Sequence, residues 1–226
     1  MTLFGLEQRT SIINKEDNNH PKVIKNIPSY APTYGITFSQ NFSNRFGIDY
    51  GALVARQEEK YEMYTDPSYP KAKLNGARKV LYMQIPILLR ADLLSKPKNV
   101  IFVAGGAQMD ILLSEDGTIP TYHTHTIGVA GDTTYGYDYL EAAGAYKRFI
   151  FDLVGSMGWR KKIYKNFFLQ LQLRANYSLS DVEDKSFSAF YAGYIYRNAY
   201  YIYSTKRLAT HNLALGAGLG LCWKFR

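Results

Sequence analysis

The chain has 226 residues, a formal net charge of +8, 46% hydrophobic residues and a mean hydropathy of −0.25. This length suits one sizeable domain, and no apolar run approaches the ~18 residues of a membrane-spanning helix. The composition therefore excludes a helical membrane protein, but it is compatible with a membrane β-barrel, in which only every second strand residue faces lipid.

The ends of the chain carry little targeting or redox information. Cys222 is the single cysteine, so an internal disulfide is excluded and a thiolate metal site has no partners. Residues 1–10 contain Glu7 and Arg9 and no apolar stretch of the ~7–15 residues that a secretory signal peptide needs. If the protein is exported, we expect a leader to have been removed or the true start to lie elsewhere.

Apolar residues alternate with polar or small ones in several runs, which predicts β-strands. Phe46, Ile48 and Tyr50 share one face, opposite Gly47 and Asp49. The C-terminal run alternates leucines with small residues over a length that fits a tilted membrane strand better than a soluble one. The predicted strands lie near 2–12, 32–42, 46–60, 78–94, 99–113, 147–161, 166–179 and 209–225.

The predicted connections alternate in length. Short turns are expected at 43–45, 95–98 and 162–165, whereas the connections near 13–31, 61–77, 114–146 and 180–208 are long. Outer-membrane barrels show this pattern, with short periplasmic turns and long extracellular loops. We therefore predict an all-β fold, an eight-stranded antiparallel transmembrane β-barrel with up-and-down meander topology, formed by residues 1–226 as a single outer-membrane domain.

The orientation of the strands follows from the cost of charge in lipid. An Arg or Lys facing the bilayer midplane costs ~2–4 kcal/mol, so we expect the apolar faces to point outward and the charged faces inward. A soluble lipocalin-like carrier would bury the apolar faces instead and remains an alternative. Aromatic residues near the short turns favour the membrane, because they resemble an interfacial girdle; they are Trp159, Phe167, Trp223 and Phe225. The predicted interior charges are Asp49, Arg90, Asp92, Asp110, Asp152 and Arg174, with Glu7 and Arg9 of the first strand.

Four segments carry a family resemblance, and one of them is the closing alternation from Leu213 to Phe225. Residues 82–90 read YMQIPILLR, a strand with a proline in a hydrophobic run, and residues 102–106 read FVAGG after a short turn. Arg174 and Tyr177 follow near the end of the seventh strand. In these features the chain resembles the PorT-like, porin-family small outer-membrane β-barrel proteins of Bacteroidota. The resemblance implies a barrel in the outer membrane, and because PorT-like proteins are tied to protein secretion, it also implies a secretion-linked role.

Positive charge gathers at the predicted periplasmic end. Charges in the long connections nearly cancel, so the excess lies beside the short turns. Such a basic rim can meet anionic phospholipid headgroups or an acidic periplasmic partner, whereas nucleic acid is excluded by the compartment. The residues of this basic rim are Arg45, Lys96, Lys98, Arg160, Lys161, Lys162, Lys165, Lys224 and Arg226.

The histidines do not form a recognisable site. His123 and His125 would share a face of a strand, but no carboxylate or cysteine accompanies them in sequence, so we interpret them as a solvated loop pair. His20 and His211 have no Ser-His-acid partners nearby. We therefore predict no catalytic, cofactor-binding or metal residues. A lipid- or glycan-modifying enzyme using His123 or His211 is kept as an alternative.

One long connection is rich in tyrosine, an amphipathic side chain suited to glycan or protein contact. Eight strands enclose an interior that side chains fill, so an open pore is not expected. We predict a non-enzymatic integral outer-membrane barrel that serves as a structural or accessory subunit of an envelope assembly. The candidate loop contact surface consists of Tyr191, Tyr194, Tyr196, Tyr200, Tyr201 and Tyr203.

Overall fold

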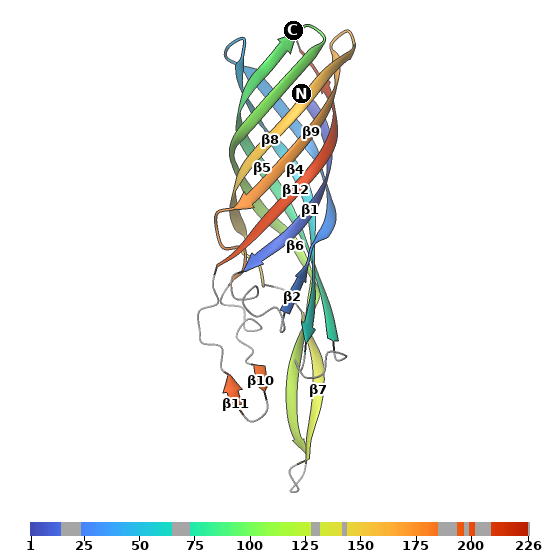
Figure 1. Ribbon diagram of the computed structural model, residues 1–226, viewed down its shortest axis with the longest axis vertical. Coiled ribbons are helices and arrows are strands. Elements are labelled where there is room, and N and C mark those ends of the chain that lie inside the picture. The colour runs from blue at the N-terminus through green and yellow to red at the C-terminus, as the bar shows by residue number, and fades with distance from the viewer. Residues whose placement is uncertain are drawn as a thin grey trace.

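The computed structural model describes residues 1–14, 24–64, 73–127, 132–141, 144–184, 194–196, 199–201 and 209–225. Eight strands form a closed barrel in which each pairs antiparallel with the next along the chain and β1 pairs with β12 (Figure 1). The predicted eight-stranded meander is confirmed. Its strands are β1 (Thr2–Asn14), β3 (Ser29–Asn41), β4 (Phe46–Tyr64), β5 (Lys73–Lys96), β6 (Asn99–Ile127), β8 (Phe149–Tyr164), β9 (Phe167–Ser178) and β12 (Thr210–Trp223).

Several strands run further than the sequence predicts. β4 and β5 stay paired out to Tyr64 and Lys73, and β7 (Asp132–Glu141) pairs with the outer part of β6. The prediction that 61–77 and 114–146 are long loops is therefore wrong in large part. Two segments that leave a barrel side by side can keep exchanging backbone hydrogen bonds beyond the membrane.

Three short strands lie in the remaining connections. β2 (Ile24–Ile27) pairs with the end of β4, while β10 (Tyr194–Tyr196) and β11 (Ala199–Tyr201) pair with each other. In the described residues, no helix is long and apolar enough to cross a membrane.

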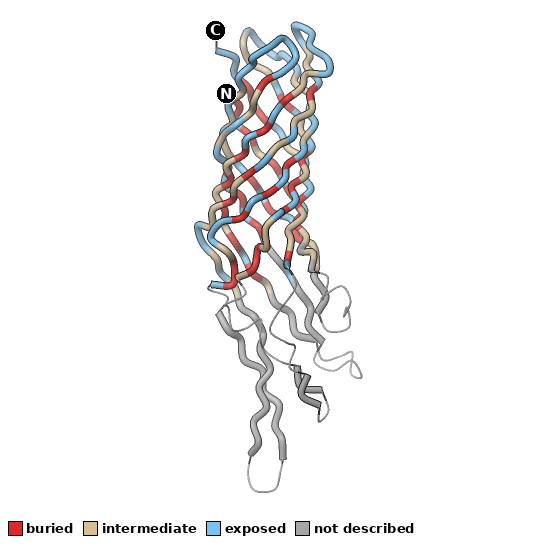
Figure 2. Tube along the Cα trace, turned by 90° about the vertical axis from the view of Figure 1, so that its left-hand side faces the viewer, coloured by how far each residue is buried: buried red, intermediate tan, exposed pale blue. Residues whose placement is uncertain are grey.

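The barrel places its apolar side chains outside and its polar side chains inside. Leu219 and Leu173 on the outer wall are 56% and 55% exposed, whereas Gln84 and Gln108 inside are 0% and 1% exposed. Buried and exposed positions alternate along the barrel strands in Figure 2. This arrangement suits a lipid surround and excludes the soluble lipocalin-like carrier, which needs its apolar face inside.

The first strand departs from the predicted orientation. Glu7 and Arg9 point outward, so the prediction that they line the interior is wrong. Glu7 lies opposite Ala217 of β12, and both residues are exposed. Residues opposite each other in a ladder share a face, so the two exposures agree. The inward positions of β1 are instead taken by Phe4 and Leu6, which pack against Leu53 within the barrel.

Close strand packing makes one glycine sensitive to substitution. A Cβ on inward-facing Gly106 would lie 2.2 Å from the backbone oxygen of Ile87, whereas a Cβ on outward-facing Gly155 would meet nothing within 4 Å. We expect Gly106→Ala to lower the free energy of unfolding by about 1–3 kcal/mol through overpacking. Gly155→Ala, the matched control, should change it by less than about 0.5 kcal/mol. Urea unfolding in detergent checks both variants, and equal effects would contradict the close approach of β5 to Gly106.

An apolar cluster lies inside the barrel at the end away from the short turns. Val80, Tyr82 and Ile150 pack there against Ala145 and Val182, which come from the segments beside β8 and β9. Those segments are held by backbone hydrogen bonds and by buried polar contacts. The contacts include Lys147 N to Val182 O at 3.0 Å, Thr210 Oγ1 to Glu183 Oε2 at 2.7 Å, and the backbone amides of Ala145 and Tyr146 to the Glu115 carboxylate, each at 3.2 Å.

Candidate functional site: a basic rim over a closed barrel interior

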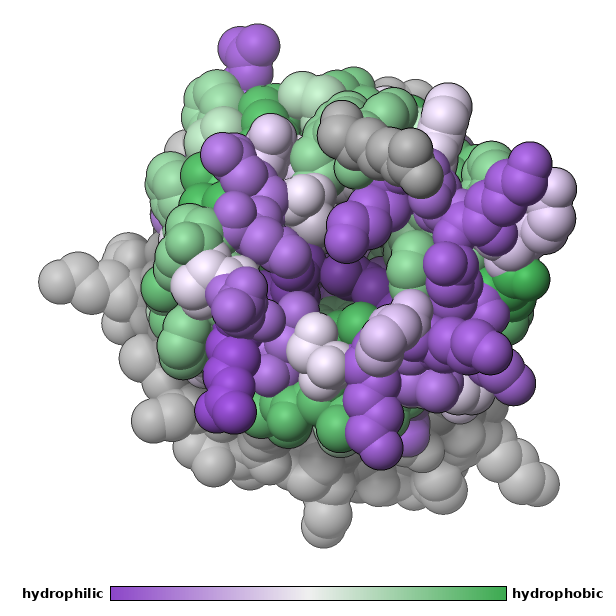
Figure 3. All heavy atoms as spheres, turned by 90° about the horizontal axis from the view of Figure 1, so that it is seen from above, coloured by the Kyte–Doolittle hydropathy of each residue, from purple (hydrophilic) through white to green (hydrophobic). Residues whose placement is uncertain are grey.

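The short turns carry exposed cations at one end of the barrel. Seen from that end, hydrophilic side chains surround a central hollow (Figure 3). Both chain termini lie at the same end (Figure 1). Long connections on the opposite side make this the periplasmic end. The exposed residues of the basic rim are Arg45, Lys96, Lys98, Lys161, Lys162, Lys165 and Lys224, whereas Arg226 lies outside the described residues.

Local backbone geometry fixes the turns that present these cations. Ser43 Oγ accepts hydrogen bonds from the amides of Arg45 at 3.2 Å and Phe46 at 2.9 Å, which closes the first turn. Lys165 has a φ of 36°, a left-handed conformation that tight turns use. The amide of Lys162 donates to Lys98 O at 2.8 Å, so the second and third turns are joined.

Arg160 does not belong to the exposed rim, so its assignment there is wrong. β8 alternates faces, and Arg160 shares the inward face with Asp152 and Val154. Its guanidinium donates to Gln170 Oε1 at 2.6 Å and lies 3.7 Å from the Asp49 carboxylate. Arg160 is therefore an interior charge beneath the rim.

A buried ion network crosses the lumen at this level. Arg90 donates to Asp49 Oδ1 at 2.6 Å and to Asp92 Oδ1 at 3.0 Å, and it also donates to Asn41. The side chain of Arg90 is only 2% exposed. The guanidinium of Arg160 lies 4.5 Å from the centroid of the Phe102 ring and places a second cation 3.7 Å from the Asp49 carboxylate. Together these side chains form a network of ion pairs and hydrogen bonds inside the barrel near its periplasmic end.

A second polar group lies deeper in the barrel. Asp110 accepts hydrogen bonds from Gln84 at 2.9 Å and Gln108 at 2.6 Å, and Arg174 donates to both Gln108 and Asn176. Asp152 is also buried, and its Oδ1 has no hydrogen-bond partner among the described atoms. The structure thus divides the interior charges between two groups, one around Arg90 and one around Arg174.

The rim contains a polar cleft that the sequence did not reveal. Its volume is about 530 Å³, and it lies between the first turn and the end of β5. Leu93 is an extra residue in the β5–β6 ladder, so the strand bulges beside the cleft. A sequence pattern could have located the turn but not the bulge beside the cleft. The lining residues are Asn44, Arg45, Asp92, Leu93, Leu94, Ser95 and Lys96.

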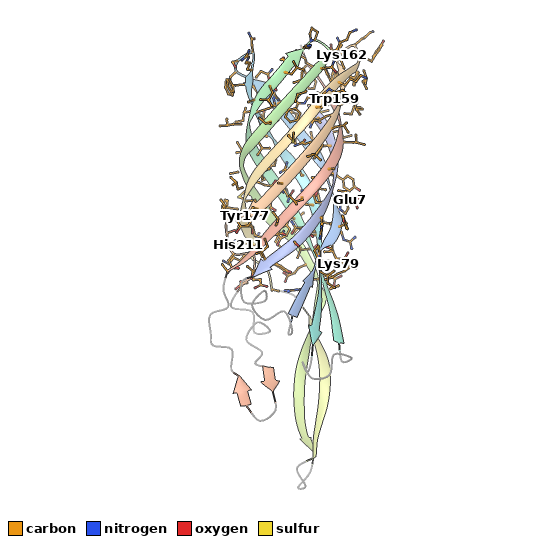
Figure 4. All side chains as sticks on the ribbon, viewed as in Figure 1. Glu7, Lys79, Trp159, Lys162, Tyr177 and His211 are labelled. Atoms are coloured by element: carbon orange, nitrogen blue, oxygen red, sulfur yellow. The ribbon has the colours of Figure 1, made fainter. Side chains whose placement is uncertain are left out.

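The aromatic girdle lies just outside the rim. Phe167 stacks on Trp223 with ring centroids 5.8 Å apart, and Trp223 contacts Phe225 at 4.8 Å. Trp159 is labelled near the same end in Figure 4, beside Lys162. Such rings occupy the membrane–water boundary, which places the rim cations at headgroup depth.

The tyrosine and histidine candidates lie toward the other end. Tyr191 and Tyr203 are outside the described residues, and of the tyrosines on β10 and β11 only the backbone is described, so their role in contact stays a prediction. His123 and His125 lie in β6, opposite Gly136 and Thr134, rather than in a loop. Their side chains and His20 are outside the described part. Among the described side chains, no group of His, Cys, Asp and Glu is placed to hold a metal ion.

His211 is described and is engaged structurally. Its Nδ1 lies 2.8 Å from Ser178 O, and its ring stacks on Tyr177 with centroids 5.4 Å apart. Figure 4 shows the two residues together toward the extracellular end of the barrel.

Solved structures with a similar arrangement are outer-membrane proteins of low sequence identity. Ail of Yersinia pestis, in complex with the heparin analogue sucrose octasulfate, is 8% identical, with 97% of this chain and 96% of that chain covered and a TM-score of 0.37. Neisserial surface protein A is 10% identical, with 99% and 96% covered and a TM-score of 0.36. The outer membrane protease OmpT of Escherichia coli is 11% identical, with 99% and 96% covered and a TM-score of 0.47. These values concern the fold and say nothing of activity.

No curated protein matches the chain in sequence. A family model described as the outer membrane protein beta-barrel domain matches residues 4–184, which include seven of the eight barrel strands. The match agrees with the closed barrel, the outward apolar rows and the aromatic girdle. The chain is an integral outer-membrane β-barrel protein and belongs to the outer membrane protein beta-barrel domain family.

Proposed function

We propose that the protein is a non-enzymatic accessory subunit of an envelope assembly and that its basic rim docks an acidic segment of a periplasmic partner. The observation that carries this proposal is the concentration of exposed cations on the periplasmic turns. Complementary charge speeds encounter and selects a partner more than it adds affinity. A rim of this kind therefore suits a subunit that positions another protein at the membrane.

The cleft supplies a place for that acidic segment. Arg45 and Lys96 flank it, and Asn44 and Ser95 add amide and hydroxyl groups that can hydrogen-bond to a carboxylate. The one acid in the lining, Asp92, is already bonded to Arg90, so it is partly neutralised. The cleft is thus suited to a carboxylate-bearing peptide.

The absence of enzymatic activity is part of the proposal. The alternative of a lipid- or glycan-modifying enzyme relied on His123 or His211, and His211 is tied to Ser178 O and to the ring of Tyr177. No observation of the described residues favours that alternative. The resemblance to PorT-like proteins supports a secretion-linked assembly as one concrete form of the proposed role.

Charge reversal on the rim tests the proposal. We expect the tagged wild-type barrel, purified from detergent-solubilised envelopes, to retain a stoichiometric periplasmic protein. The Arg45→Glu, Lys96→Glu double variant should lose that protein, because two attractive charges at the cleft become repulsive. Quantitative mass spectrometry of the eluates measures the retained protein.

A control reverses one charge at the far end of the barrel, and it is compared with the single Lys96→Glu variant at the cleft. Lys79→Glu should retain the partner, since Lys79 lies toward the extracellular side (Figure 4). A wild-type barrel that always elutes alone would contradict the role as a subunit. In that case the cations of the basic rim would contact only the phospholipid headgroups of the inner leaflet.

A further inference from the structure

The paired outer part of β6 and β7, residues 118–127 and 132–141, forms a two-stranded ribbon that we call the outer ribbon. His123 and His125 are two residues apart on β6, so they share a face of this ribbon with Cα atoms about 7 Å apart. They pair with Gly136 and Thr134 of β7. The partner strand therefore places only small residues opposite the two histidine positions.

The same register places two aspartates beside the histidines. Asp138 is two residues along β7 from the partner of His123, so it lies on the same face and diagonal to His123. Asp132 stands in the same relation to His125. Diagonal neighbours in a ladder are about 7–8 Å apart, which is within reach of long side chains. Each histidine position thus has an aspartate as a diagonal neighbour.

The two faces of the outer ribbon differ in composition. Residues opposite each other in a ladder share a face, and consecutive residues of a strand lie on opposite faces. Both histidines and both aspartates of the outer ribbon therefore lie on one face. The other face carries Glu141 and the tyrosines of the ribbon, which are Tyr122, Tyr135, Tyr137 and Tyr139.

Two imidazoles with neighbouring carboxylates match the ligand preferences of one class of metal ion. Imidazole suits Zn²⁺, Cu²⁺ and Ni²⁺, whereas Mg²⁺ and Ca²⁺ prefer sites made of oxygen ligands. A metal-bound histidine usually donates its second ring N–H to a carboxylate, a backbone carbonyl or water, which orients the ring and raises its basicity as a ligand. The register places one aspartate beside each histidine for this role, and the two carboxylates offset the charge of a divalent ion.

We propose that His123 and His125 bind one divalent metal ion of the Zn²⁺ class on the outer ribbon, supported by the two diagonal aspartates. The interpretation of these histidines as a solvated loop pair rests on the lack of a carboxylate near them in sequence. The pairing of β6 with β7 supplies two carboxylates and removes that objection. The outer ribbon projects from the end of the barrel opposite the chain termini (Figure 1), so this proposal does not depend on the periplasmic partner.

Titration with zinc chloride tests this proposal. The full chain in neutral detergent is first freed of bound metal with a chelator, which is then removed, and Zn²⁺ binding is measured by isothermal titration calorimetry. We expect the wild type to bind one Zn²⁺ per chain in a saturable manner. For His123→Gln, His125→Gln, the apparent affinity should fall by at least roughly 100-fold, because the loss of supporting carboxylates alone costs about 10–100-fold.

Matched variants separate this site from general attraction of the metal ion, and the heat-dependent shift in gel mobility checks that each variant folds. His20→Gln, His211→Gln also removes two histidines and should keep the wild-type affinity. Asp138→Asn should weaken binding about tenfold. Glu141→Gln makes the same change of charge on the other face of β7 and should not weaken it. Equal Zn²⁺ affinities of the two double histidine variants would overturn the proposal, and equal losses for Asp138→Asn and Glu141→Gln would contradict the supporting role of the aspartates.

Discussion

Replacing Arg90 with methionine should lower the free energy of unfolding by about 3–5 kcal/mol, one of the largest losses expected for a single substitution in this barrel. Arg90 holds Asp49 at 2.6 Å and Asp92 at 3.0 Å, and all three side chains are largely buried. Removal of the guanidinium leaves two carboxylates inside the lumen without their main partner. Urea unfolding in lipid vesicles, followed by tryptophan fluorescence, measures the loss.

Two matched variants separate the buried network from the effect of losing a cation. Arg45→Met on the exposed rim should change stability by less than about 0.5 kcal/mol. Adding Asp49→Asn and Asp92→Asn to the Arg90→Met chain should restore much of the stability, because no uncompensated charge then remains. If Arg90→Met unfolds at the wild-type urea concentration, the network does not stabilise the barrel.

Replacing Leu219 with arginine should cost about 2–4 kcal/mol, because the new charge would face the hydrocarbon core. Leu219 points outward from β12, and its nearest outward neighbours along the strand are Ala217 and Leu221. The same measurement in vesicles applies, with folded yield as a second readout.

The control for Leu219→Arg is the same change at the membrane boundary. Ile163 is 55% exposed beside the third periplasmic turn, and Ile163→Arg should cost no more than about 1 kcal/mol. Equal costs at the two positions would argue against lipid around the barrel wall, since only a lipid surround makes the cost depend on depth.

The strands and their orientation were predictable where alternation is unambiguous. In β8 and β12 every second residue is apolar, and the cost of charge in lipid then decides which face points outward. The first strand could not be assigned in this way. Phe4 and Leu6 lie on one face of this strand, and Glu7 and Arg9 lie on the other, a pattern that suggests a charged interior. The register of β1 with β3 and β12 instead turns the face with Glu7 and Arg9 outward. Register is a property of pairs of strands, so a single segment does not reveal it.

The candidate site was likewise predictable from the sequence only in part. Runs of lysine beside short turns were enough to predict cations at the periplasmic end, because short turns are exposed. The inward side chain of Arg160 and the cleft beside Leu93 depend on where a strand ends and where a bulge interrupts its ladder. Sequence alternation carries no information on such local irregularities.

The outer hairpin has a mechanical consequence. β6 runs without a break from Asn99 in the barrel wall to Ile127, and β7 pairs with its outer part, so the wall and the projecting ribbon share one continuous strand. Residues 118–127 alone give the ribbon a reach of roughly 30 Å beyond the point where that pairing begins. A force applied to the ribbon is borne by the hydrogen bonds between its strands and passes along β6 into the barrel wall. A flexible loop of the same length could not transmit such a force.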